Sequence, residues 1–140
     1  MKHILLVTFL AVTALFSYAQ CDKKVVLTAS RTEHLKADSS LERADEENTV
    51  IEFDKTTFSV TPGDHPLLFG KINSFSCDWP TPFKTGTTRL KTTLTDESGE
   101  AKDLTITIEG KNGKIVVIAT MDGDPGHRIR LTADKFEAKQ

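Results

Sequence analysis

An alternating stretch between residues 103 and 120 places the strongest constraint on how this chain can fold. Apolar and polar side chains alternate with a period of two over residues 104–109, which is typical of a β-strand with one buried face. Residues 110–113 suit a tight turn, because Gly and Asn tolerate the positive φ angles that hairpins require. Apolar residues resume at 115–118. The stretch therefore predicts a β-hairpin.

Most of the remaining chain repeats this pattern of short apolar alternations separated by turn residues. Eight strands are predicted, at about residues 25–34, 49–54, 58–60, 67–76, 87–95, 104–109, 115–118 and 128–133. Gly70 lies inside the fourth strand and predicts a bulge or a sharp bend there. No region between the strands has the length and the apolar period of a crossover helix.

Three stretches break the pattern. Residues 35–48 are crowded with acidic side chains and predict a long solvated loop with one helical turn. Residues 77–83 contain two prolines, which disfavour both helix and sheet interior, and predict a rigid aromatic loop. Residues 135–140 are predicted to be a tail that Phe136 anchors.

The short connections favour antiparallel neighbours throughout, and therefore an all-β meander. Eight meandering strands close naturally into a small up-and-down barrel, and closure hides the edges that a flat sheet would expose. A β-sandwich of the immunoglobulin type is the alternative.

Residues 1–19 are predicted to be a signal peptide rather than part of the fold. Lys2 precedes an apolar run at residues 4–16, and small residues occupy the two positions that a signal peptidase reads before cleavage after Ala19. The run is too short to span a bilayer, and no second apolar stretch predicts a transmembrane segment. Residues 20–140 are then a single exported domain, periplasmic or secreted. Lipidation at Cys21 is disfavoured because the preceding Gln20 is not small.

Two cysteines in a chain bound for an oxidising compartment predict a disulfide between Cys21 and Cys77. The meander places both at the same end of the barrel, so the prediction of the disulfide and that of the topology support each other. Trp79 and Phe83 follow in the predicted aromatic loop and are expected to close that end.

The charge balance argues against one class of partner. Without Lys2 the chain has 17 basic and 20 acidic side chains, whereas nucleic-acid-binding proteins concentrate positive charge. The sequence also has no Gly-x-Ser-x-Gly and no cofactor motif, and neither cysteine has a histidine close in sequence. We therefore expect a non-enzymatic protein with no cofactor and no catalytic residue, although a pair of carboxylates that meets only in space stays open.

The opposite end of the predicted barrel collects the candidate site residues. The meander brings three histidines and three aspartates to one rim: His34, Asp64, His65, Asp122, Asp124 and His127. Histidines and carboxylates could ligate zinc, yet none of the spacings is a known ligand pattern, and the Asp122-x-Asp124 pair lacks the other ligands of a calcium loop. No metal is predicted, and a rim metal site is the third functional alternative.

An export signal, an eight-stranded meander and two cysteines make the chain resemble the small secreted lipocalin-like proteins of bacteria. The resemblance implies a barrel that binds a small apolar or amphipathic ligand. No residue role is carried over, because the first strand lacks the Gly-x-Trp pattern of lipocalins.

The leading hypothesis is therefore a non-enzymatic exported barrel that binds a small hydrophobic ligand or a cell-envelope protein. The second is an adhesion or inhibitor module acting through surface loops 35–48 and 78–86. Interior volume distinguishes the two, because eight-stranded barrels are near the size that side chains alone can fill. The bulky residues expected inside slightly favour a filled core: Leu27, Ile51, Phe53, Phe58, Leu68, Ile72, Leu90, Leu94, Ile106, Val117, Ile129 and Leu131.

Overall fold

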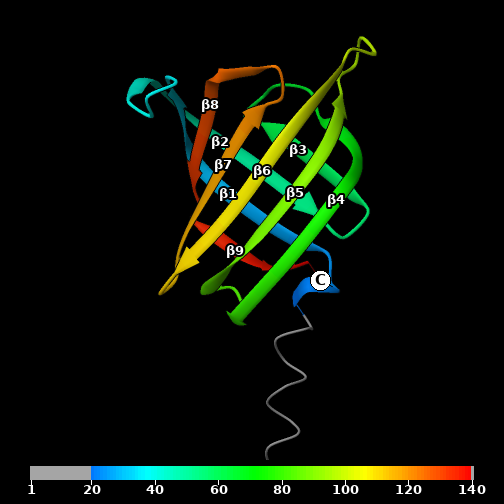
Figure 1. The fold of residues 1–140 in the computed structure, drawn as a ribbon, viewed down its shortest axis with the longest axis vertical. Coiled ribbons are helices and arrows are strands. Elements are labelled where there is room, and N and C mark those ends of the chain that lie inside the picture. The colour runs from blue at the N-terminus through cyan, green and yellow to red at the C-terminus, as the bar shows by residue number, and fades with distance from the viewer. Residues whose placement is uncertain (1–19, 140) are drawn as a thin grey trace, which may run out of the picture.

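The computed structural model describes residues 20–139, so the predicted signal peptide lies outside the described residues. The described chain is all β (Figure 1). Its strands are β1 (Val25–Leu35), β2 (Leu41–Phe53), β3 (Thr57–Pro62), β4 (Leu68–Thr81), β5 (Thr85–Thr95), β6 (Ala101–Lys111), β7 (Lys114–Met121), β8 (Asp124–Thr132) and β9 (Lys135–Ala138). No helix among these residues is long and apolar enough to cross a lipid bilayer.

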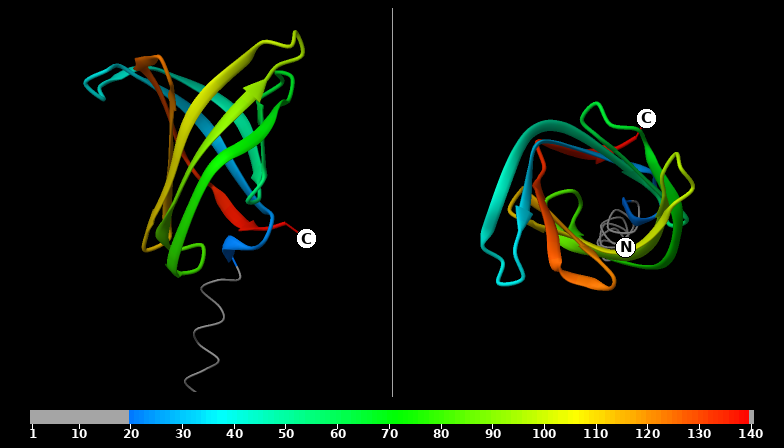
Figure 2. Two further views of the ribbon diagram at one scale, coloured as in Figure 1. Left: turned by 45° about the vertical axis from the view of Figure 1, so that its right-hand side comes forward. Right: turned by 90° about the horizontal axis from the view of Figure 1, so that it is seen from above.

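The sheet closes on itself. Each strand from β1 to β8 pairs antiparallel with the next, and β8 returns to pair with β1, which gives the ring seen from above in Figure 2. The predicted up-and-down barrel is confirmed, and the sandwich alternative is wrong. We call the end with turns 36–40, 63–67, 96–100 and 122–123 the mouth, and the opposite end the base.

The barrel closes at a divided seam. The upper part of β1 pairs with β8 through four residue pairs, and its lower part pairs with β9. Between β8 and β9 the chain stays hydrogen-bonded, because Ala133 N–H donates to Ile115 O at 2.9 Å and Asp134 N–H donates to Thr28 O at 2.7 Å. The predicted tail is thus a ninth strand. Phe136 anchors it as expected, since its ring lies 5.4 Å from Trp79 and 5.0 Å from Phe83.

An ion pair on the outer face spans the upper seam. Arg130 Nη2 and Nε donate to the two carboxylate oxygens of Glu33 at 2.9 and 3.2 Å, across directly paired positions of β1 and β8. These hydrogen bonds hold the pKa of Glu33 below its ordinary value of 4.5. Because the pKa is depressed in the folded protein, the pair stabilises the fold above about pH 4.5, and its contribution is lost as the pH falls through the folded-state pKa.

We expect Glu33→Gln to lower the free energy of unfolding at pH 7 by up to about 1 kcal/mol, the upper range for partly exposed pairs. The difference from wild type should disappear in acid, where Glu33 is protonated in both folded and unfolded chains. Urea denaturation at several pH values measures this. Glu42→Gln is the control, because Glu42 is exposed and has no ion pair within residues 20–139. A constant difference across the pH range would contradict the assignment.

The predicted loop at 35–48 is wrong. Only residues 36–40 form a turn, in which Ser39 has a φ of 69° and Asp38 Oδ1 accepts hydrogen bonds from Ser40 N–H and Oγ–H. From Leu41 onward the chain is β2, paired with β1 as far as Phe53. Residues 41–48 form a strand rather than a solvated loop because β1 offers a complete edge of backbone donors and acceptors. Charged side chains do not prevent backbone pairing.

The predicted loop at 77–83 is also wrong, because β4 continues through Cys77 to Thr81. Its ladder with β5 is interrupted between Asp78 and Thr81, and Pro80 lies in this interruption, where its missing N–H removes no ladder hydrogen bond. A short turn remains, with Phe83 at a φ of 60°. Both long loops of the surface-module hypothesis are therefore mainly strand.

The β6–β7 hairpin is confirmed, with a turn at Asn112 and Gly113, whose φ angles are 50° and 89°. Gly110, predicted to be in the turn, is inside β6. The irregularity expected at Gly70 is found instead as a register shift between Ile72 and Ser74. Gly70 allows β4 and β5 to approach each other closely, because a Cβ at this position would lie 1.8 Å from the Thr93 carbonyl oxygen.

The base of the barrel is closed by a disulfide and an aromatic cluster. Cys21 and Cys77 are bonded, as predicted. Trp79 is 1% exposed, and its Nε1–H donates to Thr88 Oγ1 at 2.8 Å. Cβ atoms built at Gly86 and Gly110 would each lie within 2.6 Å of Trp79. Those two glycines therefore make the space that the indole ring fills.

Candidate functional site

The upper half of the barrel contains a cavity of about 240 Å³ beneath the mouth. Strands β1 to β8 all contribute to its wall, and twelve of its 16 lining residues are apolar. The lining consists of Thr32, His34, Glu47, Thr49, Ile51, Phe58, Val60, Pro62, Leu68, Leu94, Leu104, Ile106, Val117, Ala119, Ile129 and Leu131. The bulky residues predicted to point inward do so, being buried or packed against the core, but they do not fill the whole interior, because most of them also line this cavity.

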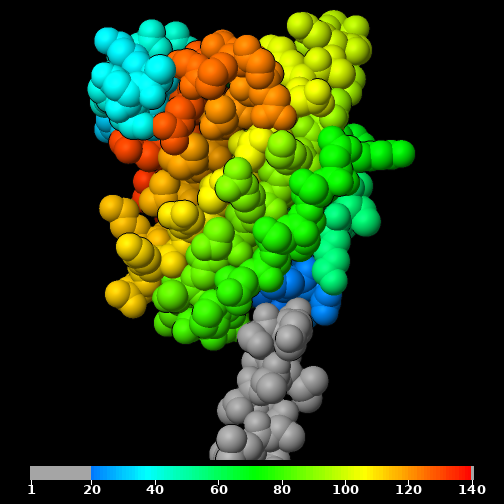
Figure 3. Space-filling model, viewed as in Figure 1, coloured from blue at the N-terminus to red at the C-terminus, as the bar shows by residue number. Residues whose placement is uncertain are grey.

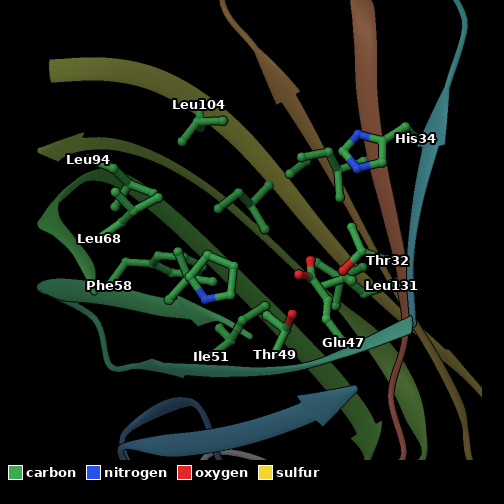
Figure 4. Close-up of a pocket in the computed structure, with 16 residues that line it drawn as sticks. Thr32, His34, Glu47, Thr49, Ile51, Phe58, Leu68, Leu94, Leu104 and Leu131 are labelled. Atoms are coloured by element: carbon green, nitrogen blue, oxygen red, sulfur yellow. The ribbon is translucent and has the colours of Figure 1, made fainter. Parts of the chain in front are cut away.

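The polar residues of the cavity lie together on one wall. Thr32, Glu47 and Thr49 come from β1 and β2, and Figure 4 shows them opposite Leu68 and Leu94. Thr32 and Thr49 are 6% and 3% exposed. Neither hydroxyl oxygen has a hydrogen-bond partner, and Nδ1 of His34 is the third buried side-chain atom of residues 20–139 without one. All three unpartnered atoms therefore belong to residues that line the same cavity.

A phase change in β1 explains why Thr32 points inward. Val25, Leu27 and Ala29 are buried in strict alternation, and the next buried residue is Thr32, one place out of phase. The change coincides with a register shift in the β1–β2 ladder between Ala29 and Arg31. A bulge of this kind redirects side chains to the other face of a strand. His34 then follows Thr32 on the inner face.

His34 connects the cavity to the mouth. Its side chain is 12% exposed, and Nε2 lies 3.2 Å from Asp45 Oδ2 and 3.5 Å from Arg43 Nη2. When Nε2 carries the proton and donates it to Asp45, Nδ1 is a hydrogen-bond acceptor; when Nε2 instead accepts from the guanidinium of Arg43, Nδ1 carries the proton and is a donor. In either tautomer Nδ1 is left without a partner on the buried side.

Glu47 is the charged group of the cavity wall. It lies on β2 two residues before Thr49 and so shares the inner face with it. A Cβ at Gly63 would lie 3.0 Å from Glu47 Oε2 and 3.3 Å from Glu47 Cβ, and Gly63 N–H donates to Asn48 O at 2.8 Å. The glycine of the β3–β4 turn thus packs against Glu47. No ion pair to Glu47 exists within residues 20–139.

The six rim residues predicted from the sequence are spread around the mouth. His34 and His127 are neighbours, with ring centroids 5.8 Å apart. His65 lies elsewhere, in a shallow groove with Asp96 and Glu97. Asp64, Asp122 and Asp124 are exposed. Between residues 20 and 139, no three His, Cys, Asp or Glu side chains gather in a way that could hold a metal ion.

Sequence reasoning missed the polar wall because it assigned residues 43–48 to a solvated loop. A usable signal was present: Arg43, Asp45, Glu47, Thr49 and Ile51 continue the odd-numbered face of β2 without a break. The comparisons with known proteins add no further assignment, because no family model, curated protein or solved structure matches this chain.

Proposed function

We propose that this protein is a non-enzymatic barrel that binds one small amphipathic molecule in its upper cavity. The observation that carries the proposal is the coincidence of three unpartnered buried polar atoms, on Thr32, Thr49 and His34, with an otherwise apolar hollow. A buried polar atom without a partner costs about 1–3 kcal/mol. A ligand with a polar head and an apolar body recovers that cost and also buries its own apolar surface.

The cavity limits the size of the ligand. Its volume of about 240 Å³ is below the ~300–1,000 Å³ that is typical of pockets for drug-sized ligands. That space suits a short alkyl chain or a small ring system with one head group, and a long two-chain lipid exceeds it. The ligand class in this proposal is therefore a small amphiphile.

The proposed location is an oxidising compartment outside the cytoplasm, periplasmic or extracellular. The Cys21–Cys77 disulfide supports it, because such bonds persist where thiols are not kept reduced. The predicted signal peptide also supports a location outside the cytoplasm.

Filling the cavity should weaken ligand binding. Ala119 lines the cavity, and its neighbour Thr120 lies on the outer face of the barrel. We expect Ala119→Phe to weaken the binding of octan-1-ol by about tenfold or more, equivalent to about 1.4 kcal/mol, and to leave the fold at least as stable because it fills a void. Isothermal titration calorimetry and thermal denaturation measure the two quantities.

Thr120→Phe is the matched control, since it adds the same ring one residue away on the opposite face. Its affinity for octan-1-ol should equal that of the wild type. If wild type binds no octan-1-ol, or if both phenylalanine variants bind as the wild type does, the cavity is not the binding site.

A further inference from the structure

The polar wall of the cavity indicates the charge of the ligand's head group. This inference rests on the proposed function and goes one step beyond it. Glu47 is half-buried on this wall and lies near the unpartnered hydroxyls of Thr32 and Thr49 (Figure 4). A carboxylate accepts hydrogen bonds and donates none. His34 Nδ1 is also an acceptor when Nε2–H faces Asp45, and the two threonine hydroxyls can accept or donate.

We infer that the ligand has a positively charged amine head, bound by the carboxylate of Glu47 together with Thr32 and Thr49, and an apolar tail that extends toward Leu68, Leu94 and Leu104. An ammonium group offers three donors to this set of acceptors. A charge-assisted hydrogen bond to a carboxylate is roughly twice as strong as one between neutral groups. An anionic head would instead meet Glu47 as a like charge in a poorly solvated site.

The charge around the mouth favours the same ligand. The four turns at this end contain six carboxylates and one lysine: Asp38, Asp64, Asp96, Glu97, Glu100 and Asp122, with Lys36. The turns 36–40, 96–100 and 122–123 lie along the upper edge of the molecule in Figure 3. Hydrogen bonds from Ser40 and Ser98 lower the pKa of Asp38 and Asp96, so these two stay ionised well into acid. An acidic rim of this kind raises the local concentration of cations at the entrance.

Arg43 is directly paired with His34 and shares the inner face of the barrel at the rim, so its positive charge offers a rival interpretation in which the ligand is anionic. Its Nε lies 3.7 Å from Asp45 Oδ2, and its side chain is 65% exposed. The carboxylate of Asp45 therefore already balances the guanidinium charge at the rim, whereas Glu47 has no such partner within residues 20–139. An anionic ligand would have to displace Asp45 from Arg43.

The test uses three ligands with the same eight-carbon tail: octylamine, octan-1-ol and octanoate. At pH 7 and low salt, calorimetric titration of the disulfide-bonded protein should give the affinity order amine, alcohol, carboxylate. We expect about tenfold or more between the first and the last. Glu47→Gln should remove most of this difference. Glu46→Gln is the control, because this substitution removes the same charge from the outer face, where Glu46 pairs with Arg31.

The other outcomes distinguish a failure of the amine-head inference from a failure of the proposed function. Equal binding of all three ligands, or an amine preference that persists in Glu47→Gln, overturns the inference and leaves the cavity as a ligand site. Tightest binding of octanoate, lost in Arg43→Gln, overturns it in favour of an anionic ligand. If none of the three binds to wild type, the proposed function fails and the inference fails with it.

Discussion

Replacing Trp79 with alanine is expected to lower the free energy of unfolding by about 3–5 kcal/mol, the range for large aromatic residues removed from a core. The indole is fully buried at the base, where it packs against Phe136 and fills space left by Gly86 and Gly110. Truncation leaves a cavity and also removes the donor to Thr88. Urea denaturation followed by circular dichroism measures the loss.

Two further variants test the cause of this loss. Phe69→Ala removes an aromatic ring from the same strand, but Phe69 is 52% exposed, so its effect should stay within about 0.5 kcal/mol. The free energy of unfolding of Trp79→Phe should lie between those of wild type and Trp79→Ala, because phenylalanine keeps part of the packing and loses the hydrogen bond. A loss below about 1 kcal/mol for Trp79→Ala would mean that the base is not held by this residue.

Removing the disulfide is expected to have an effect of similar size. The bond links residues 56 apart in sequence, and the chain-entropy relation gives about 4 kcal/mol for a loop of that length. The bond also holds the N-terminal segment against the base. There Gln20 Oε1 accepts a hydrogen bond from Phe83 N–H at 2.7 Å, and Lys55 pairs with Asp22.

The double variant Cys21→Ser/Cys77→Ser should therefore unfold at lower urea concentration than wild type. Reductant should bring wild type close to the variant and leave the variant unchanged. A second comparison uses Ala119→Phe, which is distant from the base and should retain the full response to reductant. Equal stability of oxidised and reduced wild type would contradict the role given to the bond.

The sequence was informative where structure follows from local pattern. The 103–120 hairpin combines a two-residue alternation with turn residues of the required φ, and both are visible in a short window. The barrel followed because short connections leave few alternatives for eight antiparallel strands. The disulfide could be predicted because the meander brings its two cysteines to one end.

The polar wall of the cavity could not be predicted in the same way. Thr32 faces inward only because β1 changes phase beside β2, and that shift depends on a partner strand which the sequence alone did not reveal. Glu47 is inside because the inner face of β2 continues through a stretch whose acidity resembles a solvated loop. In both cases strand pairing, a nonlocal interaction, determined the outcome against a local signal.

The central claim is that a small amine-headed amphiphile occupies the upper cavity, and its location can be measured directly. Titrating octylamine into protein with labelled Leu and Ile methyl groups should shift the resonances of Leu68, Leu94, Leu104 and Ile129, which line the cavity. Ile115, which is buried beside Gly110 at the base, should stay unchanged, as should the exposed Leu41. Shifts confined to Leu41 and other exposed residues, or no saturable shift, would contradict the account.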